Sequence, residues 1–174
     1  MASNNLINFI KKWEGVKYNP YLCPAGKPTI GVGFTTYLDG TPVTLNDPPL
    51  DDIQINRILS VKLDEFSAQV KRILGDTLIV SLPQEALDAI ISWTYNLGIG
   101  NLSKSTLLKR LKESKLNFDA IETEWMKWVY AGGKKLDGLV RRRKEEYQMY
   151  FNAVISQYRP AEAYNLGKYG KIKR

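Results

Sequence analysis

Residues 14–33 read Glu-Gly-Val-Lys-Tyr-Asn-Pro-Tyr-Leu-Cys-Pro-Ala-Gly-Lys-Pro-Thr-Ile-Gly-Val-Gly, and they mark a change in the character of the chain. Before them, apolar residues recur at helical spacing behind Ser3, a good N-cap residue, and Gly15 is well placed to end that helix. Residues 15–50 hold six of the eight prolines and five of the 13 glycines, as is typical of turns and short strands. The sequence predicts a short helix that ends in Glu14 and leads into a β-rich lobe.

Helical patterns dominate the rest of the chain. From Asp52 to Gly75 the apolar residues advance by three or four positions and form one stripe of a long helix. The stretch from Ser81 to Gln84 has the form of a capping box with a proline in the first turn, and it opens an apolar helix that stops near Gly98.

Three further helical patterns follow around 103–114, 118–129 and 138–157, with Gly132-Gly133 separating the last two. We therefore predict an α+β fold, in which a β-rich lobe of about residues 15–50 is inserted early in a mainly helical body. A cleft between the two lobes is the expected ligand site.

The composition limits the chemistry that this chain can perform. With 174 residues, of which 44% are apolar and 25% charged, it has the size and composition of one globular domain. The single cysteine excludes an internal disulfide, and the lack of histidine excludes a Ser-His-Asp triad and metal sites that use histidine. No apolar run is long enough to span a membrane and the first residues do not resemble a signal peptide, so we expect a protein made in the cytoplasm.

Charge is distributed unevenly along the chain. Residues 1–100 carry 8 basic and 10 acidic side chains, a net −2, whereas residues 101–174 carry 17 and 8, a net +9. The surplus of positive charge in the second half suggests an anionic partner. A non-catalytic domain that binds nucleic acid is one interpretation of this charge. We expect no nucleic acid as partner, because no helix-turn-helix, zinc-finger or RNA-binding signature accompanies the charge.

The reactive side chains concentrate at the junction between the first helix and the β-rich lobe. A glutamate at a helix C-terminus, such as Glu14, lies at the negative end of the helix dipole, which favours the protonated form that a general acid needs. An isolated glutamate at a helix end is usually a solvated surface residue. Cys23 and Thr29, which follow closely, favour a functional interpretation of Glu14.

The spacing of these residues resembles a known catalytic signature. Eight residues separate Glu14 from Cys23 and five separate Cys23 from Thr29, which is similar to the Glu, Asp or Cys, and Thr pattern of phage-type lysozymes, or endolysins. The resemblance spans residues 6 to about 150 and includes four further motifs: Thr-Ile-Gly-Val-Gly at 29–33, the stretch 84–100, Ser-Thr-Leu-Leu at 105–108, and the stretch 128–143.

The resemblance implies a lysozyme-like fold and an N-acetylmuramidase that hydrolyses the β-1,4 bond between N-acetylmuramic acid and N-acetylglucosamine in peptidoglycan. Glu14 would be the general acid, and Thr29 would orient a water molecule through its hydroxyl. The second position is commonly aspartate, whose pKa is ~3.9 against ~8.5 for a thiol, so Cys23 does not offer the same fixed charge. Cys23 would act as a weak acceptor that places water, as a thiolate, or as a small buried apolar residue; its motif position favours participation.

Two residues of the helical body match supporting positions of the family. Asn96 matches an amide that lines the cleft and would bind N-acetyl or hydroxyl groups of the substrate, although it also suits a helix C-terminus beside Gly98. Arg142 matches an arginine that approaches the catalytic glutamate and would hold Glu14 in position. A solvated helix face is the other explanation for the basic run 141–143.

The resemblance also sets expectations about partners and organisation. We expect a catalytic domain over 1–157 and a basic tail over 158–174, with no metal and no cofactor. The partner would be bacterial peptidoglycan, with weak attraction to anionic envelope polymers or lipids. The enzyme would be a monomer that waits in the host cytoplasm until a holin breaches the membrane, and then lyses the cell wall. A lytic transglycosylase that forms anhydro-muramyl products is the alternative enzyme.

Overall fold

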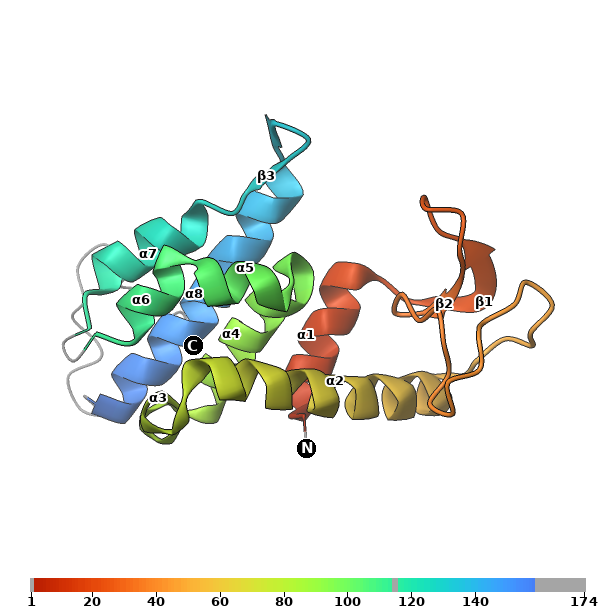
Figure 1. Ribbon diagram of the computed structural model, residues 1–174, viewed down its shortest axis with the longest axis horizontal. Helices are drawn as coiled ribbons and strands as arrows, with labels where there is room; N and C mark the ends of the chain where they lie inside the picture. The colour runs from red at the N-terminus through yellow and green to blue at the C-terminus, as the bar shows by residue number, and fades with distance from the viewer. Residues whose placement is uncertain (1, 114–115, 159–174) are drawn as a thin grey trace. The chain divides into compact units, whose positions relative to one another are not determined.

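The structure, a computed structural model, describes residues 2–113 and 116–158 and consists of two compact units, Met1–Arg72 and Ile73–Arg174 (Figure 1). The predicted basic tail lies outside the described residues, apart from Tyr158 at its start. Helices dominate and two small antiparallel sheets accompany them, which confirms the α+β prediction. Among the described residues, no helix combines the length and the apolar character that a membrane span requires.

The first unit opens with helix α1, Asn4–Glu14, whose two ends are those predicted from the sequence. The Ser3 hydroxyl oxygen accepts a hydrogen bond from the Leu6 amide at 3.0 Å and caps the N-terminus. At the other end Gly15 adopts a φ of 77°, in the left-handed region, and its N–H donates to the Lys11 carbonyl. Glu14 is therefore the last residue of the helix.

The β-rich lobe is also confirmed, and its strands are short. Strands β1 (Lys17–Leu22) and β2 (Pro28–Gly31) pair antiparallel. At the end of β2 the backbones of Ile30 and Phe34 exchange two hydrogen bonds of 2.9 and 2.8 Å, which closes a tight turn. Gly31 has a φ of 65° in this turn, and a Cβ there would lie 2.6 Å from the Phe34 ring. Gly31 and Gly33 both have positive φ values, so the glycines of this motif serve the close turn.

Helix α2, Asp52–Leu74, follows the lobe and carries the predicted apolar stripe. It begins with a capping box, because the Asp51 amide donates to Gln54 Oε1 at 2.9 Å and the Gln54 amide donates to Asp51 Oδ1 at 2.7 Å. Lys11 of α1 lies 3.1 Å from the Asp52 carboxylate and 2.9 Å from Asn56 Oδ1. These contacts hold α1 against the start of α2.

The second unit has a short helix α3 (Asp76–Ser81) that the sequence analysis did not predict, followed by the central helix α4 (Gln84–Leu97). The predicted capping box at Ser81 is wrong: Pro83 occupies the N-cap position, and the Ser81 hydroxyl instead donates to the Leu78 carbonyl at 2.8 Å. Helix α4 stops at Gly98 as expected: Gly98 is its C-cap residue and has a φ of 96°.

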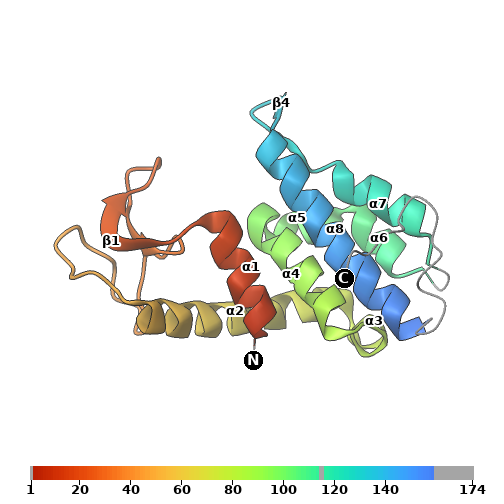
Figure 2. The same cartoon turned by 180° about the vertical axis from the view of Figure 1, so that it is seen from behind.

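The remaining elements of the second unit are helices and one small hairpin. Helices α5 (Ile99–Lys104) and α6 (Thr106–Leu111) replace the single predicted pattern, and α7 (Phe118–Met126) and α8 (Asp137–Tyr158) follow. Strands β3 (Tyr130–Ala131) and β4 (Lys134–Lys135) form a hairpin with Gly132 and Gly133 at its turn, where only a break was predicted. Figures 1 and 2 both show α4 alongside α8, and fully buried aromatic side chains of this unit include Trp93, Trp125 and Tyr150.

Candidate active site

Glu14 is presented to solvent by the end of α1. Its side chain is exposed, and only Gly15 and Val16 separate it from strand β1. The three residues Leu6, Ile7 and Ile10 are buried on the other face and fix the helix that carries it. The predicted position of Glu14, between the end of the first helix and the hairpin, is therefore confirmed.

Cys23 and Thr29 are brought together by the β1–β2 hairpin. Thr29 lies opposite Tyr21 in the register, and Cys23 follows β1 directly. The Cys23 amide donates to the Lys27 carbonyl at 3.0 Å, so the loop between the strands folds back toward β2. The Cys23 thiol makes a hydrogen bond with the Thr29 side chain, which is almost fully buried.

The surroundings of the Cys23 sulfur favour negative charge. Hydrogen bonds with the Lys27 backbone, the Thr29 side chain and the Ala25 backbone lower the pKa of the Cys23 thiol from its usual value. The thiol is partly exposed, which argues against the interpretation of Cys23 as a small buried apolar residue.

The Thr29 hydroxyl has a second partner in the same loop. It donates to the Lys27 carbonyl at 2.9 Å. A hydroxyl has one hydrogen, so it donates at any moment either to this carbonyl or to the Cys23 sulfur, and only donation to the sulfur lowers the pKa of the thiol. In both cases its oxygen keeps lone pairs for a water molecule.

Asn96 and Arg142, the supporting candidates, both lie in the second unit. Asn96 is half-buried near the end of α4, and its Oδ1 accepts a hydrogen bond of 2.9 Å from Arg143 Nη2. Arg142 is buried, and its Nε donates to Glu146 Oε1 at 3.1 Å. That Arg142 holds Glu14 in position stays a prediction, as does the cleft between the lobes.

Glu146 is the centre of a buried polar cluster that the sequence analysis did not identify. Its carboxylate oxygens accept from Ser92 Oγ at 2.8 Å, from Trp125 Nε1 at 3.4 Å, and from Arg142 and Arg143. Burial raises the pKa of Glu146, while the Arg143 and Arg142 guanidinium groups act in the opposite direction. The Trp125 and arginine groups can only donate, so both Glu146 oxygens act as acceptors toward them.

A signal for this cluster was present in the sequence. Glu146 follows Arg143 by three residues and Arg142 by four, which are the two spacings that place side chains on one helix face. The spacing does not reveal burial, so it does not distinguish this cluster from an exposed ion pair.

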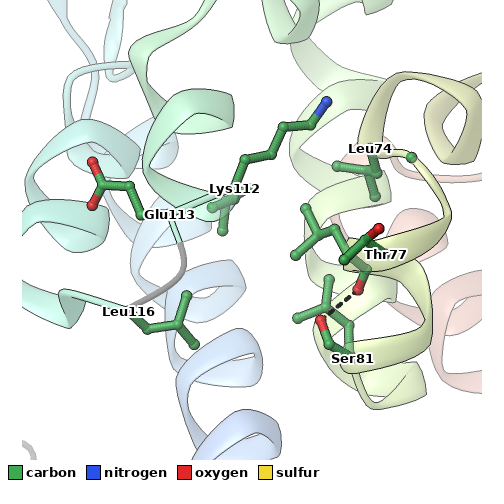
Figure 3. A pocket seen from close by; sticks show the side chains of 10 residues that line it. Leu74, Thr77, Ser81, Lys112, Glu113 and Leu116 are labelled. Atoms are coloured by element: carbon green, nitrogen blue, oxygen red, sulfur yellow. Dashed lines mark hydrogen bonds between the residues drawn. The ribbon is translucent and has the colours of Figure 1, made fainter.

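A pocket of about 540 Å³ lies elsewhere in the second unit and contains none of the candidate residues (Figure 3). Its lining is mostly apolar. Of its two charged residues, Lys112 donates a hydrogen bond to the Ile73 carbonyl and Glu113 forms an ion pair with Arg110. Among residues 2–113 and 116–158, no cluster of acidic or cysteine side chains has the composition of a metal site.

Comparison with known proteins extends over both units. A family model described as phage lysozyme matches residues 11–146. The endolysin of Acyrthosiphon pisum secondary endosymbiont phage 1 is 33% identical over 148 residues, which cover 83% of this chain and 93% of that protein. The endolysin of Bacillus phage B103 is 31% identical over 145 residues, and there the match covers 83% of this chain but only 51% of the relative. Among solved structures, the endolysin from Escherichia coli O157:H7 phage FAHEc1 superimposes with a TM-score of 0.72 at 30% identity, covering 86% of this chain and 92% of that chain.

Proposed function

This chain belongs to the phage lysozyme family, whose enzymes act on bacterial peptidoglycan, and we propose that it hydrolyses the β-1,4 bond between N-acetylmuramic acid and N-acetylglucosamine. One observation carries the proposal: an exposed glutamate at a helix end directly precedes a hairpin in which Cys23 and Thr29 are in contact. Glycoside cleavage requires a proton for the leaving oxygen and a water or nucleophile to trap an oxocarbenium-like centre on the opposite side. The helix end supplies the first group and the hairpin supplies the second.

Glu14 is the proton donor in this mechanism. Its exposed carboxyl is accessible to a polymer that arrives from solvent, and in its protonated form it delivers the proton to the bridging oxygen. The bond between that oxygen and the muramic acid ring then breaks, and the Glu14 carboxylate remains beside the oxocarbenium-like centre.

Thr29 and Cys23 act on the attacking water. Whether its hydrogen is donated to the Lys27 carbonyl or to the Cys23 sulfur, the Thr29 oxygen accepts a hydrogen bond from the water and orients it. The donors around the Cys23 sulfur support its participation as an acceptor or as a thiolate. A thiolate would also stabilise the positive charge that develops on the sugar.

The Glu14→Gln variant tests the assignment of the acid. Glutamine keeps the shape of the side chain but carries no transferable proton, so we expect lysis of purified peptidoglycan to be lost while the protein still folds. Glu113→Gln, a change at an exposed ion pair in the other unit, is the matched control and should lyse normally. Undiminished lysis by Glu14→Gln contradicts the proposed mechanism.

Mass spectrometry of the released fragments distinguishes the hydrolase from the lytic transglycosylase. Hydrolysis adds water and leaves a reducing muramic acid end, whereas a transglycosylase closes an anhydro ring with the sugar's own hydroxyl. We expect reducing ends, and fragments that carry only anhydro ends would overturn the hydrolytic step.

Substitutions at Cys23 test its participation. Cys23→Asp restores a fixed carboxylate at this position and should be active, while Cys23→Ala removes the acceptor and should lose most activity. Cys23→Ser, which keeps a small acceptor without thiol acidity, separates water placement from thiolate chemistry. Full activity of Cys23→Ala would show that the sulfur takes no part.

The proposal also includes the expectations about the oligomeric state of the enzyme, its release and its attraction to the cell envelope. They comprise a monomeric enzyme, release from the host cytoplasm through a holin, and weak attraction of the basic half to anionic envelope polymers or lipids. A salt-dependent loss of binding to whole cell walls would support that attraction, because screening weakens interactions between exposed charges.

A further inference from the structure

Lys11 lies one turn before Glu14 on helix α1. Residues three positions apart are neighbours on a helix surface, so a free Lys11 side chain is able to reach the Glu14 carboxylate. A cation at that place favours the ionised form of Glu14, whereas a general acid has to hold its proton. The place of the Lys11 ammonium therefore bears directly on the proposed chemistry.

The Lys11 ammonium is held by helix α2 instead. Its Nζ lies 3.1 Å from Asp52 Oδ1 and 2.9 Å from Asn56 Oδ1, and the side chain is only 19% exposed. Within the described part of the chain, Lys11 makes no ion pair with another carboxylate, that of Glu14 included. Two of the three hydrogens of the ammonium are thus donated to α2.

The Asp52 carboxylate is itself held in place by its surroundings. Asp52 is the first residue of α2, where the positive end of the helix dipole favours a negative charge. The Tyr18 hydroxyl, on strand β1, lies 3.3 Å from Asp52 Oδ2 and donates to this carboxylate. The backbone supports the same arrangement, because the Leu50 amide donates to the Tyr18 carbonyl at 2.9 Å. One carboxylate therefore joins α1, β1 and α2, all within the first unit.

Other charged groups contribute to the environment of Glu14. Lys12 belongs to α1 and Lys17 begins β1, and both side chains are exposed. Arg142 of α8 is the predicted partner of Glu14. These three groups are unchanged in the variants below, so differences between the variants come from the substituted residues.

We propose that Asp52 is a positioning residue of the lytic reaction, which keeps the Lys11 ammonium on α2 so that this cation does not pair with Glu14. The inference rests on the proposed function, because it takes Glu14 to be the general acid. Without the Asp52 carboxylate, Lys11 pairs with Glu14 and a larger fraction of Glu14 is ionised at a given pH. The alkaline limb of the pH profile of kcat/KM, where the acid loses its proton, then moves to lower pH.

Asp52→Ala is the decisive variant. It removes both oxygens that face Lys11 and leaves a good helix former in the first turn of α2. An exposed ion pair is worth up to about 1 kcal/mol, so we expect the alkaline limb to move down by about 0.3–0.7 pH unit. Carbon-13 NMR of the Glu14 side-chain carboxyl, assigned from the loss of its signal in Glu14→Gln, should show the same change in the titration midpoint.

Lys11→Met separates this positioning role from a structural one. Methionine keeps a long apolar side chain without the charge, so this variant should titrate Glu14 nearly as the wild type does. In the double variant Lys11→Met with Asp52→Ala no cation is released, and we expect the wild-type limb and midpoint to return. A direct field of the Asp52 charge would instead shift Glu14 equally in both backgrounds, and a lost structural contact would not be restored by a second substitution.

Glu65→Ala is the matched control. Glu65 is another exposed acidic residue of α2, so this variant has the same change in net charge as Asp52→Ala. It should keep the wild-type pH profile and the wild-type midpoint. Thermal unfolding of each variant, measured alongside, shows that the comparison is made between folded proteins.

The failure of this inference and the failure of the proposed function give different results. If the wild-type protein does not cleave peptidoglycan, or Glu14→Gln cleaves it normally, the proposed function fails. If the wild type cleaves it and Asp52→Ala keeps the wild-type limb and midpoint, the positioning role of Asp52 is wrong. A shift of equal size in the Lys11→Met background overturns it as well, whereas a shift that Lys11→Met abolishes supports it.

Discussion

Removing the charge of Glu146 should destabilise the second unit strongly. In the Glu146→Gln variant one carboxylate oxygen becomes an NH₂ group, which must face donors whichever way the amide turns. One side presents Ser92 and both arginines, and the other presents Trp125 Nε1 and Arg143 Nε. The two buried guanidinium groups also lose their shared counter-charge.

The magnitude follows from the burial of the cluster. Breaking a buried ion pair by removal of one partner costs about 3–5 kcal/mol, because an uncompensated charge stays in the interior. A typical domain is stable by about 5–15 kcal/mol, so this single change would remove a large share of the stability. For a chain of this length, about 1 kcal/mol lowers the melting temperature by about 2–4 °C, which predicts a total decrease of about 6–20 °C.

Urea unfolding, followed by tryptophan fluorescence and circular dichroism, measures this loss. Trp125 donates to Glu146, so fluorescence reports directly on the cluster. Glu113→Gln is again the control: its ion pair with Arg110 is exposed, and its loss should cost about 0–1 kcal/mol. If Glu146→Gln lost no more than this control, the carboxylate would not be the counter-ion that stabilises the buried arginines.

Three further predictions concern the first unit. Gly31→Ala should lower the unfolding free energy by about 2 kcal/mol or more, because it adds a Cβ at a φ of 65° and against the aromatic ring three residues later; an unchanged urea midpoint would contradict the close turn. Thr29→Val should raise the pKa of the Cys23 thiol, because it removes one of the hydrogen bonds that lower it; titration of thiolate absorbance measures the shift, and an unchanged titration curve would exclude that hydrogen bond. The Thr44 hydroxyl and amide lower the pKa of Asp47, so this carboxylate stabilises the fold above its unfolded pKa of about 3.9, and the contribution is lost as the pH falls. Asp47→Asn should therefore flatten the pH dependence of stability on the acid side, and an equally steep loss in the variant would refute the assignment.

Local chemistry in the sequence determined the elements that carry the candidate acid and its partners. Ser3 and Gly15 define the ends of α1, and the proline- and glycine-rich stretch 15–50 defines the β-rich lobe. These features depend on neighbours within a few positions, so their outcome can be read from a short window. The contact between Cys23 and Thr29 is of the same kind, because one hairpin joins them.

A local pattern led to a wrong prediction where two segments have the same capping-box sequence pattern. The stretch from Ser81 to Gln84 and the stretch from Asp51 to Gln54 both look like capping boxes, but only the second forms one. Ser81 is the last residue of a preceding helix, and its hydroxyl is already donated to that helix. The residues around a cap decide whether its side chain is available.

Only the tertiary structure decided the roles of the three successive arginines. Arg141 is exposed whereas Arg142 and Arg143 are buried, because successive residues turn by about 100° around a helix and only one face of α8 meets the interior. The contact between Arg143 and Asn96 joins residues 47 positions apart and exists because α4 and α8 pack side by side. The sequence by itself therefore determined which groups could do chemistry and which local elements carry them, whereas packing over long range decided which charges are buried and which way the Asn96 amide faces.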